Sequence, residues 1–244
     1  MSLMLLMMLV ALVAMVYASV GHGGASGYLA TLALLGYDPV HLSASALVLN
    51  VLVAGLAFAA FRGAGHFSWR LTWPFLVASI PAAALGGWLP VSRRVYGVFL
   101  AAALLAAALR LWLKPPEAHA VRSGPRWSVA LPVGGGIGLM SGLVGVGGGI
   151  FLSPVLLCCR WADAKRTAAT SALFIVVNSL AGLAGRVVAG GFDVGMLLPL
   201  VGAAFVGGCI GSQWGAYRMA HPRLCQILGV VLLVAAGKLV ALHG

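Results

Sequence analysis

Two clusters of glycine interrupt long apolar stretches of this chain, and they mark the chemistry that the sequence favours. The second cluster, residues 145–149, contains Gly147, Gly148 and Gly149 in succession and is followed by the apolar run 150–152. A break followed by a new helical piece points unpaired N–H groups, and the positive end of the helix dipole, into the protein. At membrane depth such backbone is tolerated only where protein buries it or it lines a cavity. The pattern therefore predicts a binding site for a small anion.

The first cluster, residues 21–27, adds an ionisable side chain. His22 lies among Gly21, Gly23 and Gly24 inside an uncharged stretch that precedes Asp38. Ionisable groups at membrane depth are candidates for function, and an imidazole could offer positive charge to an anion or carry a coupled proton. A histidine satisfied by a backbone carbonyl explains the residue equally well, because the second cluster has Val146 in its place.

Polar side chains near the two clusters could complete such a site. Ser45, Thr170 and Ser171 begin apolar segments beside the breaks, although serine and threonine also bond to their own helix. Asn50 and Asn178 lie within segments, where hydrogen bonding between helices is the ordinary role. Consecutive glycines favour a break over GxxxG-type helix packing. The candidate substrate-binding residues are Gly21, His22, Gly23, Gly24, Ser45, Asn50, Gly145, Gly147, Gly148, Gly149, Thr170, Ser171 and Asn178.

Composition defines the class of protein that must hold these residues. Hydrophobic residues make up 62% of the 244 residues and charged residues 8%, so we predict an all-α, polytopic helical membrane protein. The basic residues that give the net charge of +11 lie mostly between apolar runs. This indicates that they determine the topology and contact lipid headgroups rather than bind nucleic acid. The four cysteines show no CxxC spacing, and nothing in the sequence indicates a metal, a nucleotide or another cofactor.

The chain divides at a polar, proline-rich segment into two similar halves. We expect an N-terminal transmembrane repeat at 1–113, a linker at 114–126 and a C-terminal transmembrane repeat at 127–244. Beyond the two interrupted stretches, spans are expected near 41–61, 71–89, 95–113, 167–185, 194–216 and 224–241. Phe67 and Pro74 recur as Phe192 and Pro199 at one fixed offset, which indicates a duplication. Paired breaks in corresponding positions of two halves mark the binding site of a transporter.

Basic residues favour one topology for the halves. If each interrupted stretch enters and leaves on one side as a re-entrant hairpin, eleven basic residues share a side and four lie opposite; if each crosses fully, the sides hold eight and seven. The positive-inside rule favours the first arrangement. We therefore predict two inverted-topology repeats, each with a glycine-broken or re-entrant first segment, a cytoplasmic linker, and both termini on the far side.

A known family shares these features. Residues 142–154 (Gly-Leu-Val-Gly-Val-Gly-Gly-Gly-Ile-Phe-Leu-Ser-Pro) and 168–171 (Ala-Ala-Thr-Ser) resemble the second-half signature of the sulfite exporter TauE/SafE family, and residues 21–27 resemble its first-half counterpart. The resemblance covers essentially the whole chain. It implies a multi-pass inner-membrane carrier that exports small sulfur oxyanions or organosulfonates. The partners expected are this anion and the bilayer; coupling to protons or sodium, and homo-oligomers, are both compatible with the sequence.

An enzyme is the alternative function. Gly24-Ala25-Ser26-Gly27 is a GxSG sequence and resembles the nucleophile motif of intramembrane serine proteases, in which a histidine on another helix activates the serine. His221 and His243 lie near segment ends, where neither is well placed for that role. The sequence therefore favours a carrier without catalytic residues.

Overall fold

A computed structural model shows a chain of α-helices with one turn of π-helix that follows α9. It describes residues 3–34, 43–89, 124–189 and 197–220, together with the single positions 226, 230 and 233. The elements are α1 (Leu3–Ser19), α2 (Ala25–Leu34), α3 (Ser43–Gly63), α4 (Trp69–Trp88), α6 (Trp127–Val144), α7 (Gly149–Cys158), α8 (Ala164–Val188), α9 (Leu197–Gln213) and η1 (Trp214–Arg218).

The predicted class of fold is confirmed. Within the described ranges, four helices are long and apolar enough to cross a membrane, at Ala44–Gly63, Trp69–Trp88, Trp127–Val144 and Ala164–Val188. The spans expected near 41–61, 71–89 and 167–185 correspond to α3, α4 and α8, and the span near 194–216 corresponds to α9 and η1. The spans expected at 95–113 and 224–241, and linker residues 114–123, lie outside the described residues.

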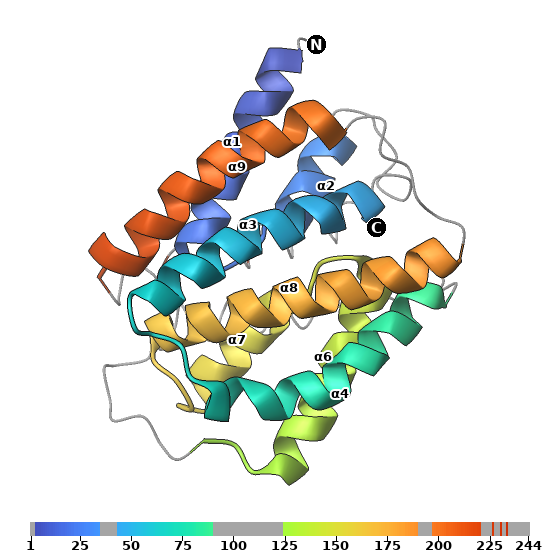
Figure 1. The fold of residues 1–244 in the computed structure, drawn as a ribbon, viewed down its shortest axis with the longest axis vertical. Helices are drawn as coiled ribbons and strands as arrows, with labels where there is room; N and C mark the ends of the chain where they lie inside the picture. Colours follow the sequence, from blue (N-terminus) through green and yellow to red (C-terminus); the bar gives the residue numbers. More distant parts are fainter. Residues whose placement is uncertain are drawn as a thin grey trace.

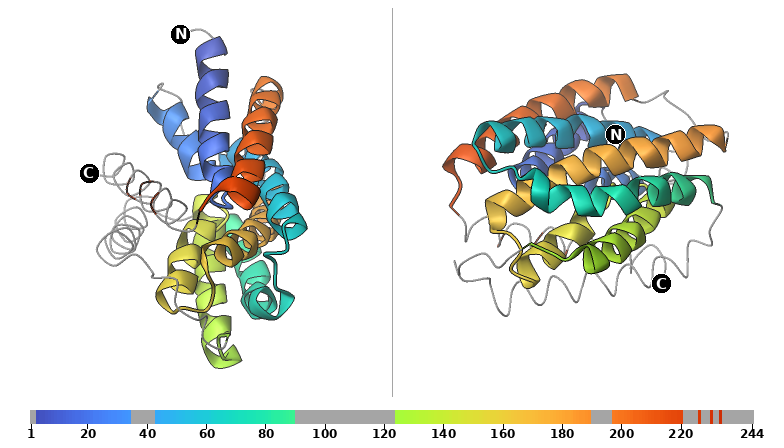
Figure 2. Two further views of the ribbon diagram at one scale, coloured as in Figure 1. Left: turned by 90° about the vertical axis from the view of Figure 1, so that its left-hand side faces the viewer. Right: turned by 60° about the horizontal axis from the view of Figure 1, so that its bottom comes forward.

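The long helices form a row with the two halves of the chain interleaved (Figure 1). α9, α3, α8, α4 and α6 lie side by side in that order in the right-hand view of Figure 2, and α1 packs along α9 at the end of the row. The first helix of each half therefore packs against the last described helix of the other half. The centre of the row is the contact between α3 and α8.

Stripes of glycine allow these helices to approach closely. On α6 and on α9, glycines recur every fourth residue and face the backbone of the neighbouring helix, where a Cβ would collide with it. On α6, Gly134, Gly138 and Gly142 face Phe75, Ser79 and Ala83 of α4. On α9 and η1, Gly207, Gly211 and Gly215 face Ala11, Met15 and Ser19 of α1. Both pairs run parallel, and this is the small-residue packing typical of membrane helices.

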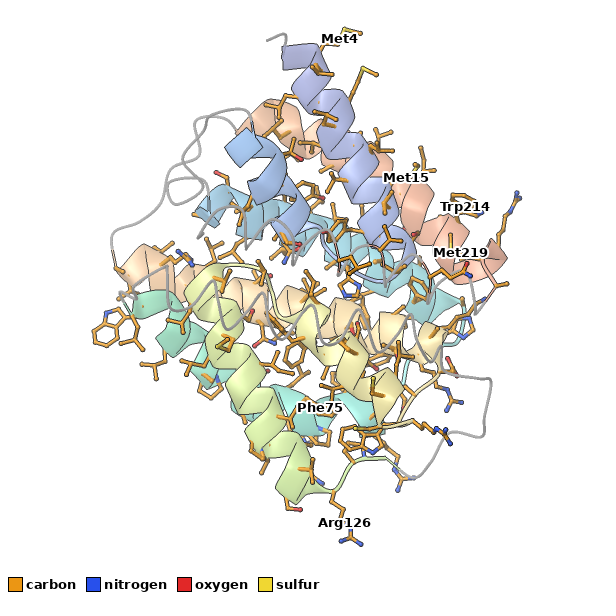
Figure 3. The ribbon with its side chains drawn as sticks, turned by 180° about the vertical axis from the view of Figure 1, so that it is seen from behind. Met4, Met15, Phe75, Arg126, Trp214 and Met219 are labelled. Atoms are coloured by element: carbon orange, nitrogen blue, oxygen red, sulfur yellow. The ribbon has the colours of Figure 1, made fainter. Side chains whose placement is uncertain are left out.

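Each interrupted stretch folds back on itself. In the first, α2 returns along α1, where the Ser26 hydroxyl lies 3.0 Å from the Tyr17 hydroxyl. In the second, α7 returns along α6, and Leu152 and Leu156 share an apolar cluster with Ala130 of α6. Met4 and Arg126, close to the starts of α1 and α6, lie at opposite ends of the molecule in Figure 3. The two hairpins therefore enter from opposite ends.

One end of the molecule gathers loops that carry basic residues. Lys165, at the start of α8, donates a hydrogen bond to the Ala216 carbonyl of η1 at 3.1 Å. His66, in the loop between α3 and α4, is partly buried near Lys165. The burial, and second the positive charge of Lys165, lower the pKa of His66. Because α6 runs parallel to α4, Arg126 belongs to the same end. These loops are among those that carry the eleven basic residues placed on one side by the predicted topology.

Candidate functional site

The two glycine clusters form the predicted helix breaks. Gly21 and Gly24 have φ values of 78° and 90° in the first break, and Gly145, Gly147 and Gly148 have φ values of 75–79° in the second. This left-handed conformation favours glycine and lets the chain reverse within a few residues. We name residues 20–24 break 1 and residues 145–148 break 2. The reversal places the first turns of α2 and α7 inside the molecule.

Asn50, in the middle of α3, connects the two breaks. Its Oδ1 accepts a hydrogen bond from the Ala25 N–H, the first residue of α2, at 3.1 Å. Its Nδ2 lies 3.3 Å from the Val146 carbonyl of break 2 and 2.9 Å from the Ser179 hydroxyl of α8. One amide therefore holds both breaks against the central pair of helices, at 1% exposure.

Glycines make room for that amide. A Cβ on Gly23 would collide with the side-chain Oδ1 of Asn50, and a Cβ on Gly147 would collide with the Nδ2 of the same side chain. Gly21 packs in the same way against the backbone of Ala168 on α8. Close approach, as well as backbone conformation, thus requires glycine at these positions.

His22 belongs to a second polar network, which runs from break 1 to α7 and α8. Its Nδ1 lies 3.0 Å from the Val20 carbonyl, and its Nε2 lies 3.3 Å from the Ser153 hydroxyl. The Ser153 hydroxyl lies 2.7 Å from that of Ser171. Because a carbonyl only accepts, Nδ1 carries a proton, and in a neutral ring Nε2 accepts from Ser153. Protonation at Nε2 would reverse the direction of this hydroxyl chain.

The remaining candidates lie at different distances from the breaks. Ser45 is buried in the first turns of α3. Thr170 lies 3.3 Å from the Thr72 hydroxyl and so is engaged with α4. Asn178 donates to the Phe174 carbonyl of its own helix at 2.8 Å. The structure therefore brings Asn50, His22 and Ser171 together with the glycines, and leaves Thr170 and Asn178 outside both networks.

Two serines take part that the sequence analysis did not single out. Ser153 links His22 to Ser171, and Ser179 binds Asn50, and both are fully buried. A weak signal for each was present, because a hydroxyl in an apolar membrane helix bonds either to its own helix or to a neighbouring one. That signal indicates burial but does not identify the partner.

The arrangement suits a small ligand that needs hydrogen-bond donors. The first N–H groups of α2 and α7 have no acceptor within their own helices, and the dipoles of both helices present positive ends there. Amide and hydroxyl groups surround them, and His22 and Asn50 are each 1% exposed. In this form the polar groups that the two networks bring to the breaks are backbone and uncharged side chains, and they are buried.

Comparison with known proteins now identifies the family. Residues 6–239 match the sulfite exporter TauE/SafE family. The chain belongs to this family. It is also similar to the probable membrane transporter protein y4hK of Sinorhizobium fredii (strain NBRC 101917 / NGR234), with 36% identity over 227 residues that cover 91% of this chain and 92% of that protein. No solved structure matches the chain.

Family membership confirms that the protein is a multi-pass membrane transporter with a small-molecule substrate and not an enzyme. The protease alternative is therefore wrong. In the structure, Ser26 is hydrogen-bonded to Tyr17 and the His22 ring faces Ser153, while His221 and His243 lie outside the described residues. The GxSG sequence is part of the turn that starts α2.

Proposed function

We propose that this transporter is a secondary carrier that exports small sulfur oxyanions, such as sulfite, or organosulfonates across the inner membrane. The observation that carries the proposal is Asn50, which joins the first turn of α2 to break 2. A dehydrated anion at membrane depth needs donors to replace its water. The N–H groups at the two breaks supply them, and the substrate binds between break 1 and break 2.

Labelled anion counterflow in proteoliposomes tests this function. Vesicles loaded with one unlabelled anion from a panel of sulfite, thiosulfate, sulfate and organosulfonates are mixed with labelled sulfite outside. We expect labelled sulfite to accumulate when sulfite or a sulfonate is inside, and empty liposomes to take up none. A reconstituted, folded protein that exchanges no member of the panel would refute the proposed substrate class.

The proposed orientation has two inverted repeats, 1–113 and 127–244, with the 114–126 linker in the cytoplasm. The opposite entry of α1 and α6 and the shared end of the basic loops support it. Basic residues concentrate on the cytoplasmic side of membrane proteins. A reporter fused after Gly244 should therefore be active only on the far side. Activity of that reporter in the cytoplasm would contradict the topology.

His22 should be needed for full transport. Replacing His22 with alanine removes the ring that joins break 1 to Ser153, so we expect weaker transport. Counterflow at one fixed pH measures the loss. His66→Ala, in the loop between α3 and α4, is the matched control and should transport at the wild-type rate. An unchanged rate in His22→Ala would show that the ring has no role in transport.

A further inference from the structure

A positive charge lies beside break 2. Arg186, near the end of α8, reaches across to α6 and donates from one guanidinium nitrogen to the carbonyls of Gly142 and Leu143, at 3.0 Å each. α6 ends one residue later at Val144, and Gly145 follows in a left-handed conformation. Arg186 therefore covers carbonyl groups of the helical turn that leads into break 2.

That turn is electrostatically unfavourable for an anion. The carboxyl end of α6 presents the negative end of its dipole to break 2, where the start of α7 presents a positive end. An anion at the break is attracted by one helix and repelled by the other. A guanidinium on the α6 carbonyls offsets the repulsion and adds attraction of its own.

Break 1 is constructed differently. The last turn of α1 is closed by backbone, with the N–H groups of Val20 and His22 donating to the Tyr17 carbonyl and that of Gly21 donating to the Ala18 carbonyl. In the part of the chain that the structure describes, no lysine or arginine hydrogen-bonds to this turn. Arg62, the counterpart of Arg186 in the first half, is exposed and lies 5.9 Å from the centre of the Phe58 ring. The two breaks therefore differ in charge.

We propose that Arg186 gives the binding site its polarity, so that the charged group of the substrate binds at break 2 and the rest of the substrate faces break 1. This inference rests on the proposed function and adds a specificity-determining residue to it. Because Coulomb energy scales with ligand charge, Arg186 favours dianions over monoanions. A residue that only capped α6 would stabilise the protein without affecting that preference.

The test compares Arg186→Gln with the wild type, using sulfate as a dianionic and methanesulfonate as a monoanionic competitor of labelled sulfite counterflow. We expect the apparent affinity to fall about tenfold for sulfate and about threefold for methanesulfonate, since the lost interaction energy is twice as large for the dianion. Arg186→Lys keeps the charge, so it should retain most of the preference and serves if the glutamine variant does not fold. Arg62→Gln is the matched control and should leave both affinities unchanged.

The outcomes separate this inference from the proposed function. If the wild type shows no counterflow with any anion, the proposed function fails. If the wild type exchanges anions but sulfate does not compete, or if Arg186→Gln weakens both competitors equally, the polarity of the site is refuted while the carrier function stands. Arg186→Lys keeps the positive charge. If it loses the preference for sulfate as completely as Arg186→Gln is expected to, a role for the charge is refuted.

Discussion

Replacing Asn50 with aspartate should reduce anion transport about a hundredfold or more. Aspartate has the same shape and still accepts the Ala25 N–H, but it loses the donor to the Val146 carbonyl and to Ser179. It also brings a negative charge to the place where we propose that the anion binds. At about 5 Å and an effective dielectric of about 20, that repulsion is about 3 kcal/mol. Counterflow at saturating and at low substrate concentrations measures the loss.

Two further variants show whether the effect belongs to this position. Asn50→Leu adds no charge but leaves its partners unpaired, at about 1–3 kcal/mol for each buried group, so both thermal stability and transport should fall. Asn178→Asp changes the second buried asparagine, whose Nδ2 donates to the Phe174 carbonyl of α8. It buries a carboxylate in the same way but outside both networks, so it should lower thermal stability and cost less transport than Asn50→Asp does. If Asn50→Asp inserts normally and transports at the rate of Asn178→Asp, the two breaks do not meet in the binding site.

The sequence predicted the breaks because they depend on local backbone chemistry. The run Gly147–Gly149 was predicted to break the helix, and the structure has left-handed glycines at Gly147 and Gly148. A run of three glycines does not by itself decide this, because Gly134–Gly136 continue α6 without a break. Hydrogen bonding of Asn50 to another helix was also predicted, since an amide in an apolar span needs a partner. What the sequence could not provide was the identity of that partner. Ser179 lies 129 residues from Asn50 along the chain, and only the packing of α3 on α8 brings them together.

The glycines show how one residue type serves two purposes. From the sequence alone, GxxxG packing is the alternative to a break at the two clusters. The structure uses both, at different positions: glycines such as Gly138 and Gly211 pack helix on helix, whereas most glycines of the breaks adopt positive φ. Spacing alone does not distinguish the two roles, because Gly134–Gly136 are consecutive and helical. Which helix each stripe packs against depends on how the halves interleave, and this is not encoded locally.

Gly147→Ala should abolish transport and lower stability. Alanine at φ of 75° adopts a left-handed conformation at a cost of about 1–2 kcal/mol. Its Cβ would also collide with the Asn50 amide nitrogen and lie 2.6 Å from the Ser179 hydroxyl oxygen. The smallest side chain thus separates Asn50 from break 2 and occupies the space where, in the proposed site, the substrate approaches the backbone. Counterflow, together with the melting temperature of the purified protein, measures both effects.

The control for this variant is Gly136→Ala, on α6 of the same hairpin. No atom lies within 4 Å of the Cβ position at Gly136, and in a helix alanine is favoured over glycine by about 1 kcal/mol. That variant should transport at the wild-type rate and melt at the same or a slightly higher temperature. Break 2 depends on an exact fit between Gly147 and Asn50, whereas Gly136 has free space around it. If Gly147→Ala transports as well as Gly136→Ala does, break 2 is a packing feature and the anion binds elsewhere.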